Sequence, residues 1–319
     1  MEIMKLIPAG KDYLWGGTRL REEYGKKIDL TPLAETGECS VHPDGPSYVA
    51  NGTYKWETLA EVLTAHPEYR GTKVENGEFP VLVKFIDAKK DLPVQVHPSD
   101  EYAREHEGDN GKTEMRYVID ADEGASLIYG FQHEVTEKIL RKSVETGTLD
   151  NHLQKVPVHK GDTYFVPAGT VYGIGEGLLL AEVQENSNVT YRVYDYDRVD
   201  KNGKKRELHF DKAVHVMDMG IAPDVKQKKR LVKYYPGCSR ELLCRCKYFE
   251  TERIQVTKGF SFSVREESFQ VLICLEGYGQ VGVDGDKPVR FTKGETVFLP
   301  AGIGRSLIIG DTSILKIRC

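Results

Sequence analysis

One motif occurs twice in the chain and constrains the fold more than any other feature of the sequence. Residues 160–175 read KGDTYFVPAGTVYGIG, and residues 293–310 read KGETVFLPAGIGRSLIIG. Each copy joins a Gly-Asp or Gly-Glu turn to a short apolar stretch that ends at Pro-Ala-Gly. Because a repeated unit of this kind indicates a repeated architecture, we expect two β domains built in the same way.

Short alternating runs surround both copies and are rich in the β-branched and aromatic residues that strands favour. Evenly spaced strands of this length are typical of sandwiches and barrels. A Gly-Asp or Gly-Glu turn before a strand that ends in Pro-x-Gly is typical of cupin jelly rolls. The sequence therefore predicts an all-β protein with helical insertions, built from tandem cupin-like jelly-roll barrels. The expected strands include residues 79–87, 92–98, 115–120, 125–131, 178–184, 189–197, 269–281 and 312–318.

Fewer segments have helical spacing of apolar residues: 56–66, 99–107, 135–156 and 210–219. Ser99 is a suitable N-cap for the second of these, and Gly147 should break the third into two short helices. The polar stretch 220–230 marks the expected boundary between a domain of residues 1–222 and a C-terminal barrel of residues 223–319.

Composition excludes several classes of partner. The 319 residues carry a net charge of −5, and the basic clusters at 201–206 and 226–230 are short enough to be solvated loops, so we expect no nucleic-acid partner. The chain contains no apolar stretch near the roughly 18 residues that cross a membrane. The six scattered cysteines and the lack of a signal-peptide pattern indicate a cytoplasmic chain, either a monomer or a weak oligomer.

A candidate metal site begins in the segment DLPVQVHPSD. Residues two apart in a strand share a face, so Gln95 and His97 should point the same way. Glu114 directly precedes another predicted strand, and Tyr172 occupies the corner of the first repeat. One Gln, one His, one Glu and a fourth position at a barrel suit a divalent transition metal such as zinc. The alternative is a histidine that is simply hydrogen-bonded or solvated.

An ordered series of motifs resembles type I mannose-6-phosphate isomerase in its short bacterial form: YLWGG, AETGECSVHPDG, DLPVQVHPSDEYA, GKTE, VPAGT, LLAEVQENSNVTYRVYDYDR and RELHF. The resemblance implies a catalytic cupin domain in residues 1–222 and one zinc ion per chain. It implies interconversion of mannose 6-phosphate and fructose 6-phosphate, so the expected partner is a small-molecule sugar phosphate. It also implies roles for individual residues: zinc ligands Gln95, His97 and Glu114; catalytic Lys112, Glu182 and Arg192; substrate-binding Lys84, Arg192 and Arg198.

Four positions depart from the family pattern. Tyr172 stands where the family normally has a histidine as the fourth zinc ligand. Pro93, Gly37 and Arg116 replace residues that are often serine, tryptophan and an aromatic residue, respectively. The departures suggest a divergent paralogue, and they favour, as the alternative function, a non-catalytic sugar-binding or regulatory cupin.

Tyr172 allows three interpretations. Zinc could be held by three protein ligands with an open fourth position, which is a normal catalytic arrangement. The tyrosine could ligate as a phenolate, since a metal can deprotonate its ligands. The metal could also be lost, leaving a barrel that only binds a sugar.

The reaction moves a proton between adjacent carbons and needs a base and a stabiliser of oxyanion charge. Glu182 lies on an apolar strand face, where burial should raise its pKa, unless it only pairs with a buried cation. Lys112 could steady an enediolate, or it could be a surface lysine. Arg192 and Arg198 can meet at one phosphate only if the chain turns between them; otherwise each pairs with a nearby aspartate.

Overall fold

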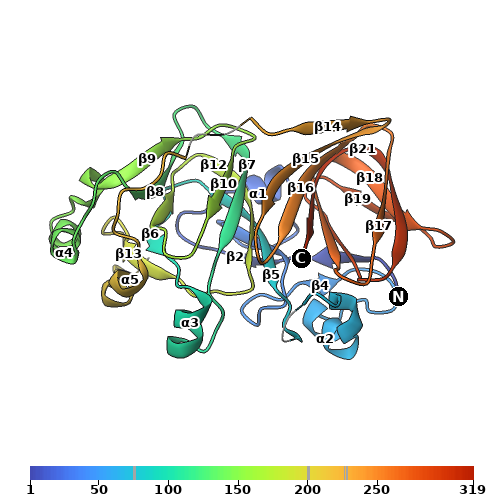
Figure 1. Ribbon diagram of the computed structural model, residues 1–319, viewed down its shortest axis with the longest axis horizontal. Coiled ribbons are helices and arrows are strands. Elements are labelled where there is room, and N and C mark those ends of the chain that lie inside the picture. Colours follow the sequence, from blue (N-terminus) through green and yellow to red (C-terminus); the bar gives the residue numbers. More distant parts are fainter. Residues whose placement is uncertain (75–76, 200–201, 226, 228) are drawn as a thin grey trace. The chain divides into compact units, whose positions relative to one another are not determined.

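The computed structural model describes residues 1–74, 77–199, 202–225, 227 and 229–319. Strands predominate and helices are few, which confirms the expected β fold with helical insertions. The chain divides into two compact units (Figure 1). Unit 1 comprises Met1–Lys11, Arg19–Phe85 and Lys228–Cys319, and unit 2 comprises Asp12–Thr18 and Ile86–Gln227. Within the two basic clusters, Lys201, Lys226 and Lys228 lie outside the described residues.

These units differ from the division expected at residues 222 and 223. The later junction lies close to that boundary, but most of the first 85 residues belong with the C-terminal strands. The reason is long-range strand pairing, in which Met4 lies opposite Phe298 in an antiparallel ladder. That residues 1–222 form the catalytic domain stays a prediction.

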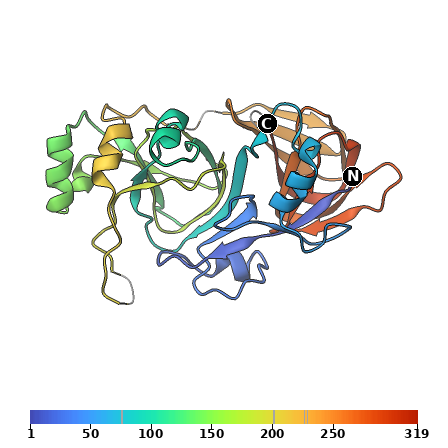
Figure 2. The ribbon, with the colours of Figure 1, turned by 90° about the horizontal axis from the view of Figure 1, so that it is seen from below.

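Unit 1 contains a ten-stranded antiparallel sheet with the order β14-β15-β16-β21-β18-β20-β1-β4, to which β17 and β19 are added. Figure 2 shows its C-terminal strands curving around a common interior, which is filled by buried apolar side chains such as Phe260, Phe291 and Ile314. The elements of unit 1 are β1 (Met4–Ile7), β2 (Ala9–Lys11), α1 (Arg19–Glu22), β3 (Glu35–Cys39), β4 (Tyr48–Val49), α2 (Leu59–Ala65), a 3-10 turn (Pro67–Arg70), β14 (Val232–Tyr235), β15 (Cys238–Arg245), β16 (Glu250–Val256), β17 (Gly259–Val264), β18 (Gln270–Val283), β19 (Val289–Thr292), β20 (Thr296–Leu299) and β21 (Gly304–Arg318).

Unit 2 contains the five-stranded sheet β13-β6-β11-β8-β9 and the strands β10-β7-β12, which pair in that order. The chain enters the unit along β5 (Val81–Ala88). Its other elements are β6 (Val94–Val96), α3 (Asp100–His106), β7 (Glu114–Ala121), β8 (Ser126–Phe131), α4 (Glu137–Glu145), a 3-10 turn (Leu149–Asn151), β9 (Leu153–Pro157), β10 (Thr163–Val166), β11 (Tyr172–Ile174), β12 (Leu178–Glu185), β13 (Tyr191–Tyr194) and α5 (Phe210–Val216).

The two copies of the repeated motif share their turn, their strand and their corner, and they differ after the corner. In each copy a Lys-Gly turn leads into a four-residue strand, β10 in unit 2 and β20 in unit 1. The turn glycines, Gly161 and Gly294, have φ of 90° and 84°, and the corner glycines, Gly169 and Gly302, have φ of 89° and 81°. Residues with a Cβ rarely adopt these angles, so glycine at both places fixes the turn and the corner.

The expected helices form, with one exception. Ser99 caps α3 as predicted, and its hydroxyl accepts a hydrogen bond from Tyr102 N. Gly147, with φ of 67°, follows α4. The second helix expected within residues 135–156 was wrong, because the chain makes only a 3-10 turn there and continues as β9. Residues 153–157 form backbone hydrogen bonds with β8 in an antiparallel ladder. This pairing outweighs their weak helical pattern.

Helices α4 and α5 lie side by side at the outer end of unit 2 (Figures 1 and 2), where Arg141 of α4 bonds Asp211 of α5 at 2.8 Å. Leu140 of α4 and Ala213 of α5 share a buried core with Val94 and Val96 of β6. The helical insertions therefore cover one face of the five-stranded sheet and leave its other face for the site described below.

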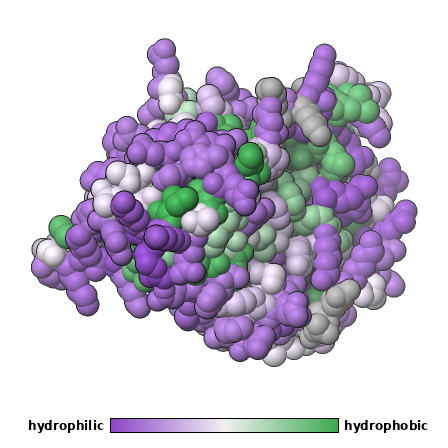
Figure 3. Space-filling model, turned by 60° about the vertical axis from the view of Figure 1, so that its left-hand side comes forward, coloured by the Kyte–Doolittle hydropathy of each residue, from purple (hydrophilic) through white to green (hydrophobic). Residues whose placement is uncertain are grey.

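Hydrophilic side chains predominate on the face drawn in Figure 3, with apolar side chains in smaller areas between them. Among the described residues, none of the helices is both long enough and apolar enough to cross a membrane.

Candidate active site and metal site

Three neighbouring strands of the five-stranded sheet present one row of polar side chains. Arg192 of β13 and Tyr172 of β11 both lie opposite Gln95 of β6. Directly opposed residues share a face of a sheet. Val94 and Val96 belong to the core on the other face, as the alternation of this segment predicted.

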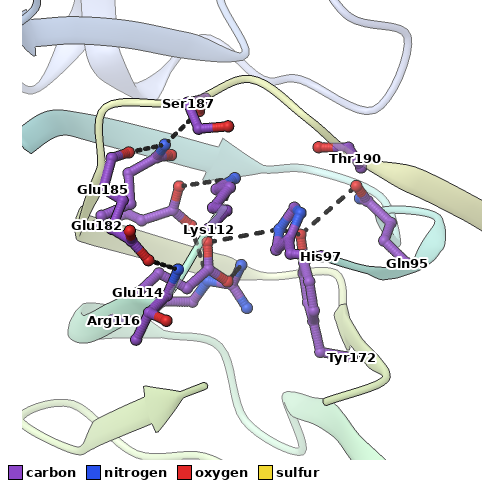
Figure 4. Close-up of polar contacts among 12 residues, drawn as sticks. Gln95, His97, Lys112, Glu114, Arg116, Tyr172, Glu182, Glu185, Ser187 and Thr190 are labelled. Carbon is purple, nitrogen blue, oxygen red and sulfur yellow. Dashed lines mark hydrogen bonds and ion pairs between the residues drawn. The ribbon is translucent and has the colours of Figure 1, made fainter. Parts of the chain in front are cut away.

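A second group of polar side chains comes from β7 and β12. Glu114 lies opposite Gln184, and Arg116 lies opposite Glu182. All four side chains are buried. Figure 4 shows the two groups converging, with His97 and Tyr172 on one side and Glu114, Arg116 and Glu182 on the other.

The loop of residues 111–113 places Lys112 in this buried region. The loop lies so close to the start of α3 that a Cβ at Gly111 would be 2.3 Å from Asp100 N, so only glycine fits there. The Lys112 side chain is 6% exposed, which excludes the surface-lysine alternative. Its Nζ lies 3.3 Å from Glu114 Oε2 and 3.9 Å from Glu182 Oε1.

His97 is fixed through both ring nitrogens. Nδ1 lies 2.8 Å from the carbonyl oxygen of Val189, which can only accept a hydrogen bond, so Nδ1 carries the proton. Nε2 then accepts a bond from the hydroxyl of Tyr172 at 2.6 Å. The Tyr172 hydroxyl also lies 3.5 Å from Gln95 Oε1, and His97 Nε2 lies 3.7 Å from Glu114 Oε2. The histidine is therefore buried and hydrogen-bonded, with its unprotonated nitrogen toward the other candidate ligands.

Arg116 is a central residue of the site, although in the sequence it stands out only as a departure from the family pattern. Its guanidinium bonds Glu114 Oε1 and, at 2.8 Å, Glu182 Oε2. Its central carbon lies 4.1 Å from the centroid of the Tyr172 ring. The signal was present in the alternation of TEMR, since residues 114 and 116 share a strand face. Glu182 thus pairs with a buried cation, which was the alternative to its role as a base.

Burial controls the ionisation of the site. Burial raises the pKa of Glu114 above its ordinary value, and Arg116 and Lys112 oppose that rise with their positive charges. Burial also raises the pKa of Tyr172 well above its ordinary value, and the charge of Glu114 adds to the effect. Tyr172 is therefore a neutral phenol that donates a hydrogen bond to His97 Nε2.

The three predicted substrate-binding cations have different environments. Arg192 Nη1 donates to Glu207 O at 2.6 Å, while its buried Nε has no hydrogen-bond acceptor among the residues that the structure describes. Arg198 is bound to the carboxylate of Asp195, so its predicted alternative partner is present. Lys84 lies in unit 1, 3.5 Å from Glu35 Oε2.

The chain does turn between Arg192 and Arg198, as a shared phosphate site requires. Strand β13 ends at Tyr194, and Tyr196 and Asp197 both have φ of 53°. The positive charges of Arg206 and Arg198 lower the pKa of Arg192, after the larger effect of burial. These arginines are therefore near enough to interact electrostatically.

The donor atoms present fit a divalent metal. Tetrahedral zinc ligands at 2.0–2.2 Å from the ion lie about 3.3–3.6 Å from one another, and the 3.7 Å between His97 Nε2 and Glu114 Oε2 is close to this. Glu114 Oε2 is buried and, among the described residues, receives no hydrogen bond. Lys112 Nζ lies 3.3 Å from this oxygen, so a bound divalent ion would share it with the ammonium. In the described part of the chain, no group of three or more His, Cys, Asp or Glu side chains could hold a metal, so a site here depends on Gln95 in addition to His97 and Glu114.

This fold and site define a cupin protein with a buried mixed-donor site. The family model for the catalytic domain of type I phosphomannose isomerase matches residues 3–128, and that for the mannose-6-phosphate isomerase cupin domain matches residues 240–318. Two curated relatives are mannose-6-phosphate isomerase ManA of Bacillus subtilis (38% identical, 95% of this chain and 94% of the relative) and mannose-6-phosphate isomerase of Streptococcus mutans (37% identical, 95% and 93%).

The solved structure of mannose 6-phosphate isomerase from Bacillus subtilis is 36% identical and covers 99% of both chains with a TM-score of 0.91. The chain therefore belongs to the type I phosphomannose isomerase family.

Proposed function

We propose that the chain is a cytoplasmic, metal-dependent isomerase that interconverts mannose 6-phosphate and fructose 6-phosphate through an enediol. The observation that carries the proposal is the convergence of Gln95, His97 and Glu114 beside Lys112 and Glu182 in one buried region of unit 2. The family relationship supports an isomerase over a non-catalytic sugar-binding cupin. Six free cysteines agree with a reducing compartment.

Gln95, His97 and Glu114 would hold the metal, and Tyr172 would stand beside it as a neutral hydrogen-bond donor. The ion, taken here as one zinc per chain, would act as a Lewis acid toward a substrate oxygen. Val189 supports the histidine, because its carbonyl fixes the tautomer in which Nε2 is unprotonated.

The remaining roles follow from charge and position. Glu182, whose carboxylate is oriented by Arg116, would take the proton from the sugar carbon and return it to the neighbouring carbon. The ammonium of Lys112 would stabilise negative charge on the developing oxyanion. Arg192 would bind the phosphate through its unsatisfied guanidinium edge, with Arg198 and Lys84 as further candidates.

A coupled assay on mannose 6-phosphate, combined with metal analysis, tests this proposal. The wild-type chain should turn over substrate, lose turnover in chelator and regain it with zinc. Glu114→Gln should lose at least about a hundredfold in kcat/KM, because it removes the only carboxylate among the candidate ligands. Glu137→Gln, an exposed carboxylate on α4 of the same unit, is the matched control and should behave as wild type.

Two further outcomes separate the parts of the proposal. No turnover with or without zinc would contradict the isomerase function, and turnover that is indifferent to chelator would contradict metal dependence. Solvent deuterium on the product carbon, when the reaction runs in heavy water, would show an enediol whose proton exchanges while Glu182 holds it. Glu182→Gln should abolish turnover, and a Glu182→Gln enzyme with wild-type kcat would exclude Glu182 as the base.

A further inference from the structure

Arg116 neutralises the same two carboxylates that a bound metal would partly neutralise. Its buried guanidinium bonds both Glu114 and Glu182, and each carboxylate also has Lys112 nearby. All four side chains are at most 6% exposed. Two cations therefore face two carboxylates, and the group is electrically balanced without any ion.

This balance determines whether the site can exist empty. Buried carboxylates without counter-charges destabilise a fold, because burial removes their hydration. Here Arg116 supplies a fork of donors in a fixed geometry, and arginine stays charged at any physiological pH. Its stacking on the ring of Tyr172 extends the contact to the side that carries His97. Within this arrangement Glu114 Oε2 faces the Lys112 ammonium at 3.3 Å and, among the described residues, receives no hydrogen bond.

We propose that Arg116 is a positioning residue that keeps the metal site folded without metal and weakens its affinity for a divalent cation. Arg116 holds Glu114 by Oε1, so that Oε2, which is shared with Lys112, lies on the side of His97 where the ion would bind. The positive charge of Arg116 opposes the approach of a further cation. Tyr172 supports this role by stacking under the guanidinium. The inference rests on the proposed metal site, but it concerns affinity and stability and does not depend on turnover.

Two substitutions separate the charge of Arg116 from its shape. Arg116→Met removes the charge and keeps most of the apolar volume, whereas Arg116→Lys keeps the charge and loses the fork. Zinc affinity is measured by competition with a chromophoric chelator, using zinc alone as the probe. Each protein is also melted with and without EDTA. The exposed Arg141, which pairs with Glu137 and Asp211, supplies the control Arg141→Met.

We expect wild-type Tm to be the same with and without EDTA within about two degrees. Arg116→Met should bind zinc at least tenfold more tightly than wild type, and its Tm should fall in EDTA and recover with zinc. Arg116→Lys should bind zinc within about threefold of wild type, and Arg141→Met should match wild type in both measurements.

Several results would overturn the inference. One is a wild-type Tm that drops by many degrees in EDTA, which requires no variant. Another is an Arg116→Met protein that binds zinc no more tightly than wild type does. A third is the finding that neither protein binds zinc. If Arg116→Met does not fold, Glu182→Gln provides the test, because it leaves Arg116 with excess charge and should weaken zinc binding at least tenfold. Unchanged binding in that variant would also overturn it. Isomerase turnover is measured in a separate assay. If the chain shows no turnover, the zinc affinities and Tm values still test the role of Arg116.

Discussion

The hydroxyl of Tyr172 lies 2.6 Å from Nε2 of His97, the nitrogen that would otherwise face a metal. Gln95 Oε1 lies 3.5 Å from the same hydroxyl. A neutral phenol in this position links two candidate ligands in the empty site. A metal held by three protein ligands, the first interpretation of Tyr172, requires this contact to break, because the phenol occupies the nitrogen that would bind the ion.

Tyr172→Phe tests that interpretation. Loss of the hydroxyl should lower the free energy of unfolding by about 1 kcal/mol, because one buried hydrogen bond is lost. Zinc affinity should not fall, as measured by chelator competition, because the variant removes a bond that the ion must displace from His97 Nε2. If the phenolate were a ligand, the variant would instead lose affinity by a factor of a hundred or more, and that result would exclude the three-ligand arrangement.

Local patterns in the sequence were sufficient for part of this site. The two-residue alternation placed Gln95 and His97 on one face, and the repeated glycines gave the corner that carries Tyr172. Arg116 was not recognised, since its meaning depends on Glu182, a partner from another strand that local spacing does not identify. The same limit explains why the two units differ from the expected division, because the pairing of Met4 with Phe298 leaves no local pattern in the sequence.

Replacement of Lys112 should lower kcat more than it changes KM for the sugar phosphate. Lys112→Gln removes a buried cation that lies within 4 Å of both carboxylates, and we expect kcat to fall about a hundredfold or more. Steady-state kinetics with mannose 6-phosphate measure this. Lys155→Gln, an exposed lysine on β9, is the control. A Lys112→Gln enzyme with wild-type kcat would remove Lys112 from the catalytic group.

Arg192 and Arg198 should differ when each is replaced by methionine. Arg192→Met should raise KM for the sugar phosphate at least tenfold, equivalent to about 1.4 kcal/mol, because its buried Nε has no described acceptor and is available to phosphate. Arg198→Met should change KM less and lower stability by about 1 kcal/mol, since Arg198 holds Asp195. The reverse pattern in KM would show that Arg198 is the main phosphate ligand.

Glu185 provides a prediction for the dependence of stability on pH. Burial raises its pKa to about 8, the negative charge of Asp100 adds to this, and the hydrogen bond from Thr113 N opposes it. The folded chain therefore keeps a proton on Glu185 over a range in which the unfolded chain, with the ordinary pKa of 4.5, has lost it. Stability from this group is fully present below pH 4.5 and is lost progressively as the pH rises toward 8.

Glu185→Gln removes this dependence, because the amide cannot lose a proton. Relative to wild type, the Tm of the variant should therefore rise steadily between pH 5 and pH 8, as measured by calorimetry in buffers of matched ionic strength. Glu137→Gln, whose carboxylate is exposed on α4, should keep a constant offset from wild type over the same range. A constant offset for Glu185→Gln as well would show that Glu185 is ionised in the folded chain, so that the loop carrying Thr113 and Glu114 is held by a carboxylate.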